Sequence, residues 1–177
     1  MLHQNSPMRI HIGHPLGRTT QAARNLADAL DGLGGGSIRA SCSASLALDQ
    51  HWPTRAGEVL RATNWLLLIF GERSLDRDWW LWEAGFFAAV HANAARRIVC
   101  LHHPDLNVPR TLHAWRTLPA TPAQTDGLLQ EIFDSHNSAG HVRTLPTDGK
   151  GLNWLKVCLM NCCLPMAEAG RDQVHAG

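Results

Sequence analysis

A tryptophan and a glutamate spaced four residues apart stand in the most aromatic segment of the chain. Residues 76–87 read DRDWWLWEAGFF, in which Glu83 follows Trp79 by four positions. On a helix this spacing places both side chains on one face. A carboxylate in apolar surroundings is costly to bury without a partner. Glu83 is therefore either a functional carboxylate in an apolar cleft or an acid that complements the dipole at the start of an ordinary core helix.

A second candidate segment is the loop after the first predicted strand. Residues 8–12 have a short strand pattern that opens into the loop GHPLGR at residues 13–18. A helix with apolar residues at helical spacing follows over residues 20–33, and the glycines at 34–36 end it. In a parallel sheet such a loop lies at the carboxyl rim, where α/β proteins bind their ligands.

Strand and helix patterns alternate along the rest of the chain. The segment NWLLLIF at residues 64–70 is continuously apolar, as a central parallel strand covered on both faces must be. The other expected strands cover residues 37–41, 96–101 and 115–119, and the other expected helices cover residues 53–62, 79–95 and 121–134. This order predicts a doubly wound α/β fold: a five-stranded parallel sheet with helices on both faces.

Length and composition limit the domain organisation. The chain has 177 residues, which fits one domain of ordinary size. We expect a short tail over residues 1–7, the α/β domain over residues 8–135 and an extension over residues 136–177. The extension contains the apolar segment LNWLKVCLMNCCL at residues 152–164. If helical, this segment requires burial, either against the domain or in a contact with another copy or a partner protein.

Charge and cysteine content indicate the setting in which the chain works. It has 16 Lys and Arg against 15 Asp and Glu, so its net charge does not favour binding to nucleic acid or to a membrane surface. Its apolar runs are shorter than the roughly 20 residues of a membrane span. The odd number of cysteines, five, with no apolar leader at the start, predicts reduced thiols and a cytoplasmic location.

Signals for metals or nucleotide-binding loops are weak. The sequence GGG at residues 34–36 does not satisfy GxGxxG, and DGKG at residues 148–151 lacks the spacing of a Walker loop. His102, His103 and Asp105, or the cysteines at 158, 162 and 163, do not show four ligands at a recognised metal-binding spacing. We therefore expect neither a metal nor a resident cofactor.

Five motifs together resemble a bacterial Toll/interleukin receptor (TIR) domain in order and spacing. They are RIHIGHPLGR, the loop at residues 42–50, NWLLLIFGERSLD, WWLWE and RRIVCL, and they cover residues 8–134. The most specific is the pair Trp79 and Glu83 directly after the third strand, which is similar to the Trp-x-x-x-Glu signature of that family. The following EAGFF resembles bacterial effector members more than animal adaptors.

The resemblance implies a flavodoxin-like fold and, for the enzymatic branch, cleavage of NAD at the bond between nicotinamide and ribose. It implies that Glu83 is the catalytic glutamate. The substrate would be bound by Trp79, by the first loop and by the loop after the third strand, through Gly13, His14, Pro15, Arg18, Gly71 and Ser74. The resemblance further implies a role in antiphage immunity, activation by self-association, and a partner protein or fused sensor domain that the extension would contact. NAD is then a substrate rather than a cofactor.

The chemistry of these residues is consistent with that activity. Departure of nicotinamide leaves a ribose with oxocarbenium character, which a nearby carboxylate can stabilise. An aromatic ring beside Glu83 could face the cationic nicotinamide.

Two other functions remain open. The chain could be a non-catalytic TIR module that binds other TIR domains, with Glu83 as a helix-start acid. It could also be similar to nucleoside deoxyribosyltransferases, which place a glutamate before Ala-Gly in a related helix, and Glu83 would then be the nucleophile.

Overall fold

The computed structural model describes residues 6–15, 19–46, 51–70, 77–94, 97–138 and 149–163. Five strands form one sheet: β1 (Met8–Gly13), β2 (Ile38–Cys42), β3 (Trp65–Phe70), β4 (Ile98–His102) and β5 (Arg116–Pro119). Neighbouring strands are parallel and stand in the order β2-β1-β3-β4-β5. This is the flavodoxin-like order, so the predicted α/β fold is confirmed.

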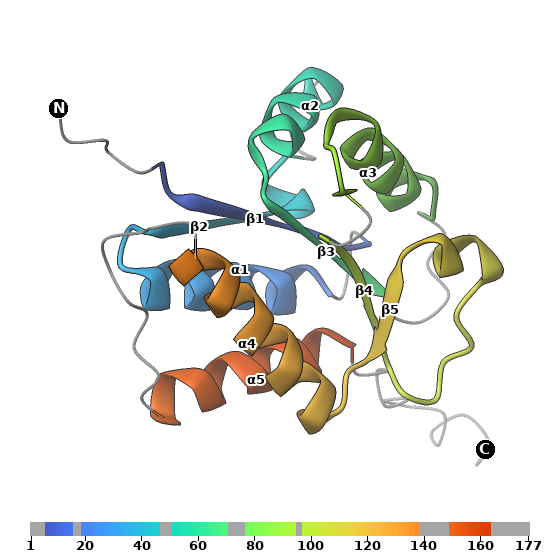
Figure 1. Ribbon diagram of the computed structural model, residues 1–177. Helices are drawn as coiled ribbons and strands as arrows, with labels where there is room; N and C mark the ends of the chain where they lie inside the picture. Colours follow the sequence, from blue (N-terminus) through green and yellow to red (C-terminus); the bar gives the residue numbers. More distant parts are fainter. Residues whose placement is uncertain are drawn as a thin grey trace, which may run out of the picture.

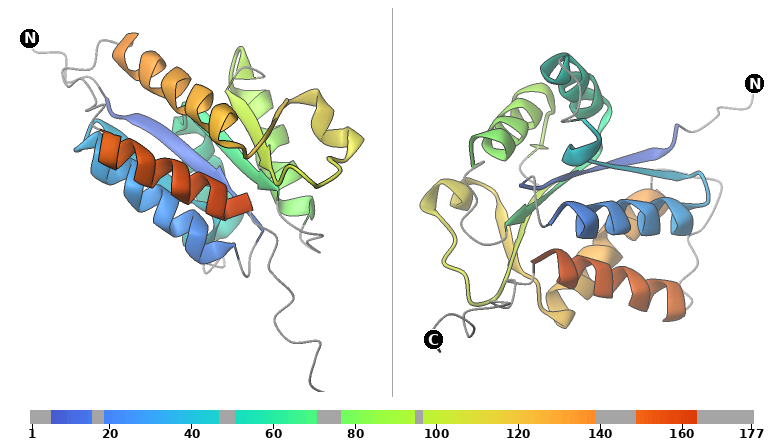
Figure 2. Two further views of the ribbon diagram at one scale, coloured as in Figure 1. Left: turned by 90° about the horizontal axis from the view of Figure 1, so that it is seen from below. Right: turned by 180° about the vertical axis from the view of Figure 1, so that it is seen from behind.

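Five α-helices lie in two layers against this sheet (Figure 1). Their bounds are α1 (Thr20–Gly34), α2 (Trp52–Ala62), α3 (Arg77–Val90), α4 (Pro122–Ser138) and α5 (Gly149–Cys163). Helices α2 and α3 cover one face, whereas α1, α4 and α5 cover the other, as Figure 2 also shows. Two short 3-10 helices, η1 (Ser43–Ser45) and η3 (Arg110–Ala114), follow β2 and precede β5.

Each face of the sheet has its own apolar core. Alternate residues of β3 point to opposite faces, so Leu67 and Ile69 pack toward α1, α4 and α5, while Leu66 and Leu68 pack toward α2 and α3. All six residues of β3 are buried. The continuous apolar run thus reflects burial on both faces, as expected for a central parallel strand.

The helix that carries Glu83 is shorter at its end than the sequence predicts. We expected it to continue to residue 95, but α3 ends at Val90. Asn93 adopts a left-handed conformation with φ of 61° three residues later, which a continuing helix does not allow. Asparagine tolerates this conformation better than most residues, so the turn into β4 begins earlier than hydrophobicity alone indicates.

Helix α5 forms part of the core on the α1 and α4 side. Leu155, Leu159 and Cys163 on this helix are completely buried, and α5 lies beside α1 (Figures 1 and 2). Trp154 and Val157 on its outer side are exposed. The buried side therefore packs within the chain. Within the described ranges, none of the helices has the length and apolar character that crossing a membrane demands.

Candidate functional site

The candidate site lies where β1 ends beside β3. Gly13, the last residue of β1, is paired with Leu68 of β3. Strand β2 lies on the other side of β1, so the connections leave β1 and β3 in opposite directions. In a sheet of this order, that switch point is where ligands bind.

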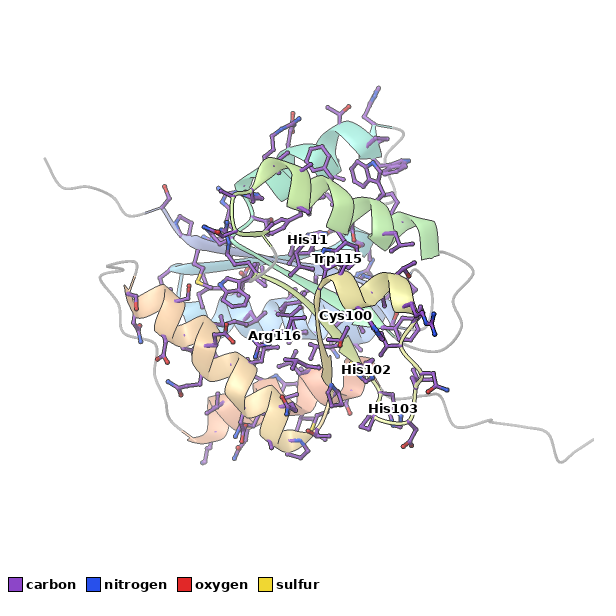
Figure 3. All side chains as sticks on the ribbon, turned by 45° about the vertical axis from the view of Figure 1, so that its right-hand side comes forward. His11, Cys100, His102, His103, Trp115 and Arg116 are labelled. Carbon is purple, nitrogen blue, oxygen red and sulfur yellow. The ribbon has the colours of Figure 1, made fainter. Side chains whose placement is uncertain are left out.

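Glu83 reaches this point from α3 and is completely buried. Its Oε1 atom lies 2.9 Å from the hydroxyl of Ser43 and 3.1 Å from Nε2 of His11. His11 is on β1 and faces α3 (Figure 3), while Ser43 is the first residue after β2. Strand β1, the residue after β2 and helix α3 thus bring three polar side chains together in an otherwise apolar layer.

The second carboxylate oxygen has a different environment. Among the described residues, none gives Glu83 Oε2 a hydrogen bond, although this atom is buried. It lies against Gly13: a Cβ added there would be 2.5 Å from Oε2 and 2.7 Å from Cδ2 of Leu68. Only glycine allows the strand to approach the carboxylate this closely. The site therefore presents one oxygen that is held and one that is available for an interaction.

His14 links the end of β1 to the segment after β2. Its Nδ1 atom lies 2.8 Å from the carbonyl oxygen of Pro15, and its Nε2 accepts a hydrogen bond of 3.2 Å from the Ala44 amide. An Nε2 that accepts carries no proton, so this histidine is neutral and protonated on Nδ1. Burial lowers the pKa of His14 below its ordinary value, and the bond to Pro15 opposes that effect. His14 thus has a structural role at the rim of the site.

Trp79 belongs to an aromatic cluster made of Trp52, Trp79, Trp82 and Phe86. The ring centroids of Trp52 and Trp79 are 3.9 Å apart with an interplanar angle of 47°. The Trp82 centroid lies 6.1 Å from that of Trp79. The buried Nε1 of Trp79 has no hydrogen-bond acceptor within the described part of the chain. One turn before Glu83, α3 therefore carries a large aromatic surface with a donor that no described residue accepts.

The structure brings together some of the residues predicted from the sequence. Gly13 lies against Glu83, and His14 is connected to Glu83 through Ser43, whose hydroxyl oxygen accepts a 3.3 Å hydrogen bond from the His14 amide. Pro15 contributes its carbonyl oxygen to His14 and to Thr19. Three other predicted residues, Arg18, Gly71 and Ser74, lie outside the described residues.

Two residues that contact Glu83 were missed by sequence reasoning: His11 and Ser43. A signal for His11 exists, because it is a polar residue in the middle of the apolar strand MRIHIG. Ser43 gives no comparable signal, since a serine directly after a strand is ordinary turn chemistry. Its relation to Glu83 depends on contacts between segments forty residues apart.

Among the described residues, the other reactive side chains form no competing site. No group of three or more potential metal ligands was found in the part of the chain that the structure describes. Burial raises the pKa of Cys100 and Cys162 to about 12, so these thiols stay protonated near neutral pH. The Glu83 cluster is thus the strongest candidate for chemistry.

Such a cluster can act on a developing positive charge or on an electrophilic carbon. A carboxylate shielded from water interacts strongly with a nearby cation, because little solvent screens it. The chain matches no protein-family model and no curated protein sequence. Its function has to be inferred from the residues and geometry of this site.

Proposed function

We propose that the chain is an NAD glycohydrolase that cleaves the bond between nicotinamide and ribose, with Glu83 as its catalytic carboxylate. One observation carries the proposal: Glu83 is buried at the switch point of the sheet with Oε1 held by Ser43 and Oε2 without a hydrogen-bond partner among the described residues. The resemblance of the surrounding motifs to TIR domains is the reason for proposing NAD as the substrate.

The reaction uses the available oxygen of Glu83. The bond between C1′ of the ribose and the nicotinamide nitrogen breaks, and its electron pair neutralises the pyridinium ring. Oε2 stabilises the positive charge that develops at C1′. Water then adds to C1′ and loses a proton, giving ADP-ribose, neutral nicotinamide and one proton. No second acid is needed, because the pyridinium leaves as a neutral molecule.

The aromatic cluster can hold the leaving group. The face of Trp79 or of its neighbour Trp52 attracts a cationic ring, and the unused Nε1–H of Trp79 can donate to a substrate oxygen. Self-association, a role in antiphage defence and a cytoplasmic location follow from the resemblance and the composition, and stay predictions.

The same geometry favours one alternative reaction. A carboxylate oxygen that receives no hydrogen bond from the described residues is also what a nucleophile at C1′ of a nucleoside requires, as in a nucleoside deoxyribosyltransferase. If the chain were a TIR interaction module, Glu83 would have a structural role through the hydrogen bonds of Oε1 alone. The experiment therefore has to separate three outcomes.

The test is nicotinamide release from NAD by wild type, by Glu83→Gln and by the control Glu58→Gln on the exposed side of α2. Glutamine keeps the shape of the side chain but removes its charge, so we expect Glu83→Gln to lower the rate about a hundredfold or more. Glu58→Gln should match wild type, and all three proteins should melt as cooperative folds.

Each contrary result has a distinct meaning. Equal turnover by wild type and Glu83→Gln would show that Glu83 is not the catalytic carboxylate. Absence of nicotinamide release, measured at dilute and at concentrated protein to allow for self-association, would exclude NAD cleavage. Base exchange on a deoxyribonucleoside under those conditions would instead favour the transferase, and inactivity on both substrates would favour the interaction module.

A further inference from the structure

We infer that His11 and Ser43 are positioning residues, which hold Oε1 of Glu83 so that Oε2 is the oxygen that acts on the substrate. This inference rests on the proposed function for its kinetic consequence, whereas the geometric part concerns the protein alone. Both residues donate to the same oxygen, from Nε2 of His11 at 3.1 Å and from the Ser43 hydroxyl at 2.9 Å.

The side chains of Ser41, His11 and Glu83 are linked by two hydrogen bonds. With the Glu83 carboxylate ionised, as the proposed reaction requires, Oε1 only accepts hydrogen bonds and His11 Nε2 is the donor. On the other side of the ring, the Ser41 hydroxyl lies 2.8 Å from His11 Nδ1. The register of the sheet places His11 directly opposite Ser41. A chain of hydrogen bonds thus runs from Ser41 on β2 through His11 on β1 to Glu83 on α3.

Ser43 is fixed independently of His11. Its oxygen accepts the His14 amide proton, and its single hydroxyl proton has two acceptors within reach, Glu83 Oε1 at 2.9 Å and the Ile12 carbonyl at 3.3 Å. The carboxylate is the nearer acceptor and, being ionised, the stronger one. Oε1 therefore receives one donor from β1 and one from the residue after β2, and together they oppose rotation of the carboxylate.

Fixing Oε1 determines where Oε2 lies. With Oε1 bound by His11 and Ser43, Oε2 lies at the end of β1, where a Cβ added to Gly13 would be 2.5 Å away. A misplacement of about 1 Å in a catalytic group can cost about a hundredfold in rate. Loss of either donor should therefore reduce the rate even though neither residue touches the reacting atoms.

The kinetic test compares Ser43→Ala, His11→Leu and His11→Gln with wild type. We expect the first two to lower kcat for nicotinamide release about ten- to a hundredfold with KM changed less than about threefold, because substrate contacts remain. His11→Gln keeps an N–H donor near the position of Nε2 and should recover most of the loss. A general packing role for His11 would not produce this recovery.

Two further variants control for folding. Ser45→Ala is the matched control, since Ser45 lies in the same short helix but its hydroxyl donates to the Cys42 carbonyl, 2.5 Å away. It should retain wild-type kcat. Ser41→Ala removes only the hydrogen bond between Ser41 and His11. It should lower kcat by less than His11→Leu does, and it tests the role of His11 if His11→Leu does not fold.

Crystal structures of Ser43→Ala and Ser45→Ala give a readout that does not depend on catalysis. Positioning predicts that the Glu83 carboxylate turns in the first variant and stays in place in the second. If wild type releases no nicotinamide, the proposed function fails while these structures still decide the positioning. An unmoved carboxylate in Ser43→Ala, or folded Ser43→Ala and Ser41→Ala proteins with wild-type kcat, would overturn the inference.

Discussion

At the scale of single residues, the close approach of Gly13 to Glu83 has the most direct consequence. Glu83 and Gly13 could both be selected from the sequence, because one stands in an aromatic helix and the other ends a strand at the carboxyl rim. His11 and Ser43 could not be assigned to Glu83 in this way, since their meeting depends on the register between β1 and β2. Sequence patterns report periodicity within an element, whereas register is decided by packing between elements.

Gly13→Ala should impair the site more than the addition of a single methyl group suggests. The added methyl would lie 2.5 Å from Glu83 Oε2, so the carboxylate or the strand has to move. We expect a loss of about 1–3 kcal/mol in the free energy of unfolding, as in other overpacked cores, and a rate reduction comparable to that of Glu83→Gln. Urea denaturation and nicotinamide release measure the two effects.

A matched control for that substitution lies on α3 itself. A Cβ on Gly85 would have no neighbour within 4 Å, and this residue is exposed in the helix interior. Gly85→Ala should therefore stabilise the protein by about 0.5–1 kcal/mol and leave the rate unchanged. If Gly13→Ala also had no effect on rate, Oε2 would not be the working oxygen.

His14 predicts how stability depends on pH. Because burial lowers its pKa in the folded protein, the unfolded chain takes up the proton first as the pH falls. The contribution of His14 is present above the ordinary value of 6.5 and is lost as the pH decreases toward the lowered pKa. The free energy of unfolding should fall below about pH 6.5 by up to about 1.4 kcal/mol per pH unit, the limit for one proton.

The measurement is the slope of unfolding free energy against pH between about pH 5 and 7. His14→Gln should have a shallower slope than wild type, because the titrating group is gone. His113→Gln, at an exposed position, serves as the control and should keep the wild-type slope. Identical slopes for His14→Gln and wild type would show that His14 does not couple protonation to folding.

At the scale of elements, the strands and most helices follow from local patterns, and the departures have identifiable causes. The continuous apolar run of β3 and the proline at the start of α2 suffice to place those elements. The predicted end of α3 was wrong, because the left-handed conformation of Asn93 stops the helix from continuing while the sequence remains apolar. The position of α5 beside α1 could not be inferred from the sequence. An apolar helix is expected to be buried, but its sequence does not show which element it packs against.

Helix α5 should contribute to stability through its buried side only. Leu159 is completely buried, so Leu159→Ala should cost about 2–5 kcal/mol of unfolding free energy. Trp154 is 57% exposed on the same helix, and Trp154→Ala should change stability by less than about 0.5 kcal/mol. Urea titrations of both variants provide the comparison. Equal, small losses would mean that α5 is not held on the domain in solution.

At the scale of the whole molecule, the site lies between the sheet and the helical layer formed by α2 and α3. Glu83 comes from α3 in the helical layer over one face of the sheet. Its two donors come from within β1 and from the residue after β2, and the aromatic cluster joins α2 to α3. Glu83 exposes none of its surface. A substrate can reach Oε2 only if groups around the carboxylate move apart, so ligand binding has to be linked to the stability of these contacts.

This linkage can be measured with a variant that binds NAD without consuming it. Glu83→Gln keeps the shape of the site, so NAD should stabilise its folded state according to the ratio of ligand concentration to dissociation constant, by about 2.7 kcal/mol at a hundredfold excess. For a chain of this length that corresponds to an increase in Tm of about 5–10 °C. Because only the open fraction of the protein binds, the apparent affinity is weaker than that of a preformed site.

A thermal unfolding titration of Glu83→Gln with NAD, repeated with Gly13→Ala added, is the required measurement. The extra methyl occupies the space beside the carboxylate, so the double variant should lose most of the increase in Tm. An equal increase in both proteins would place NAD somewhere other than the end of β1. No increase in either, at NAD concentrations up to several millimolar, would separate this buried carboxylate from dinucleotide binding and leave it as a structural link between α3 and the two strands beneath it.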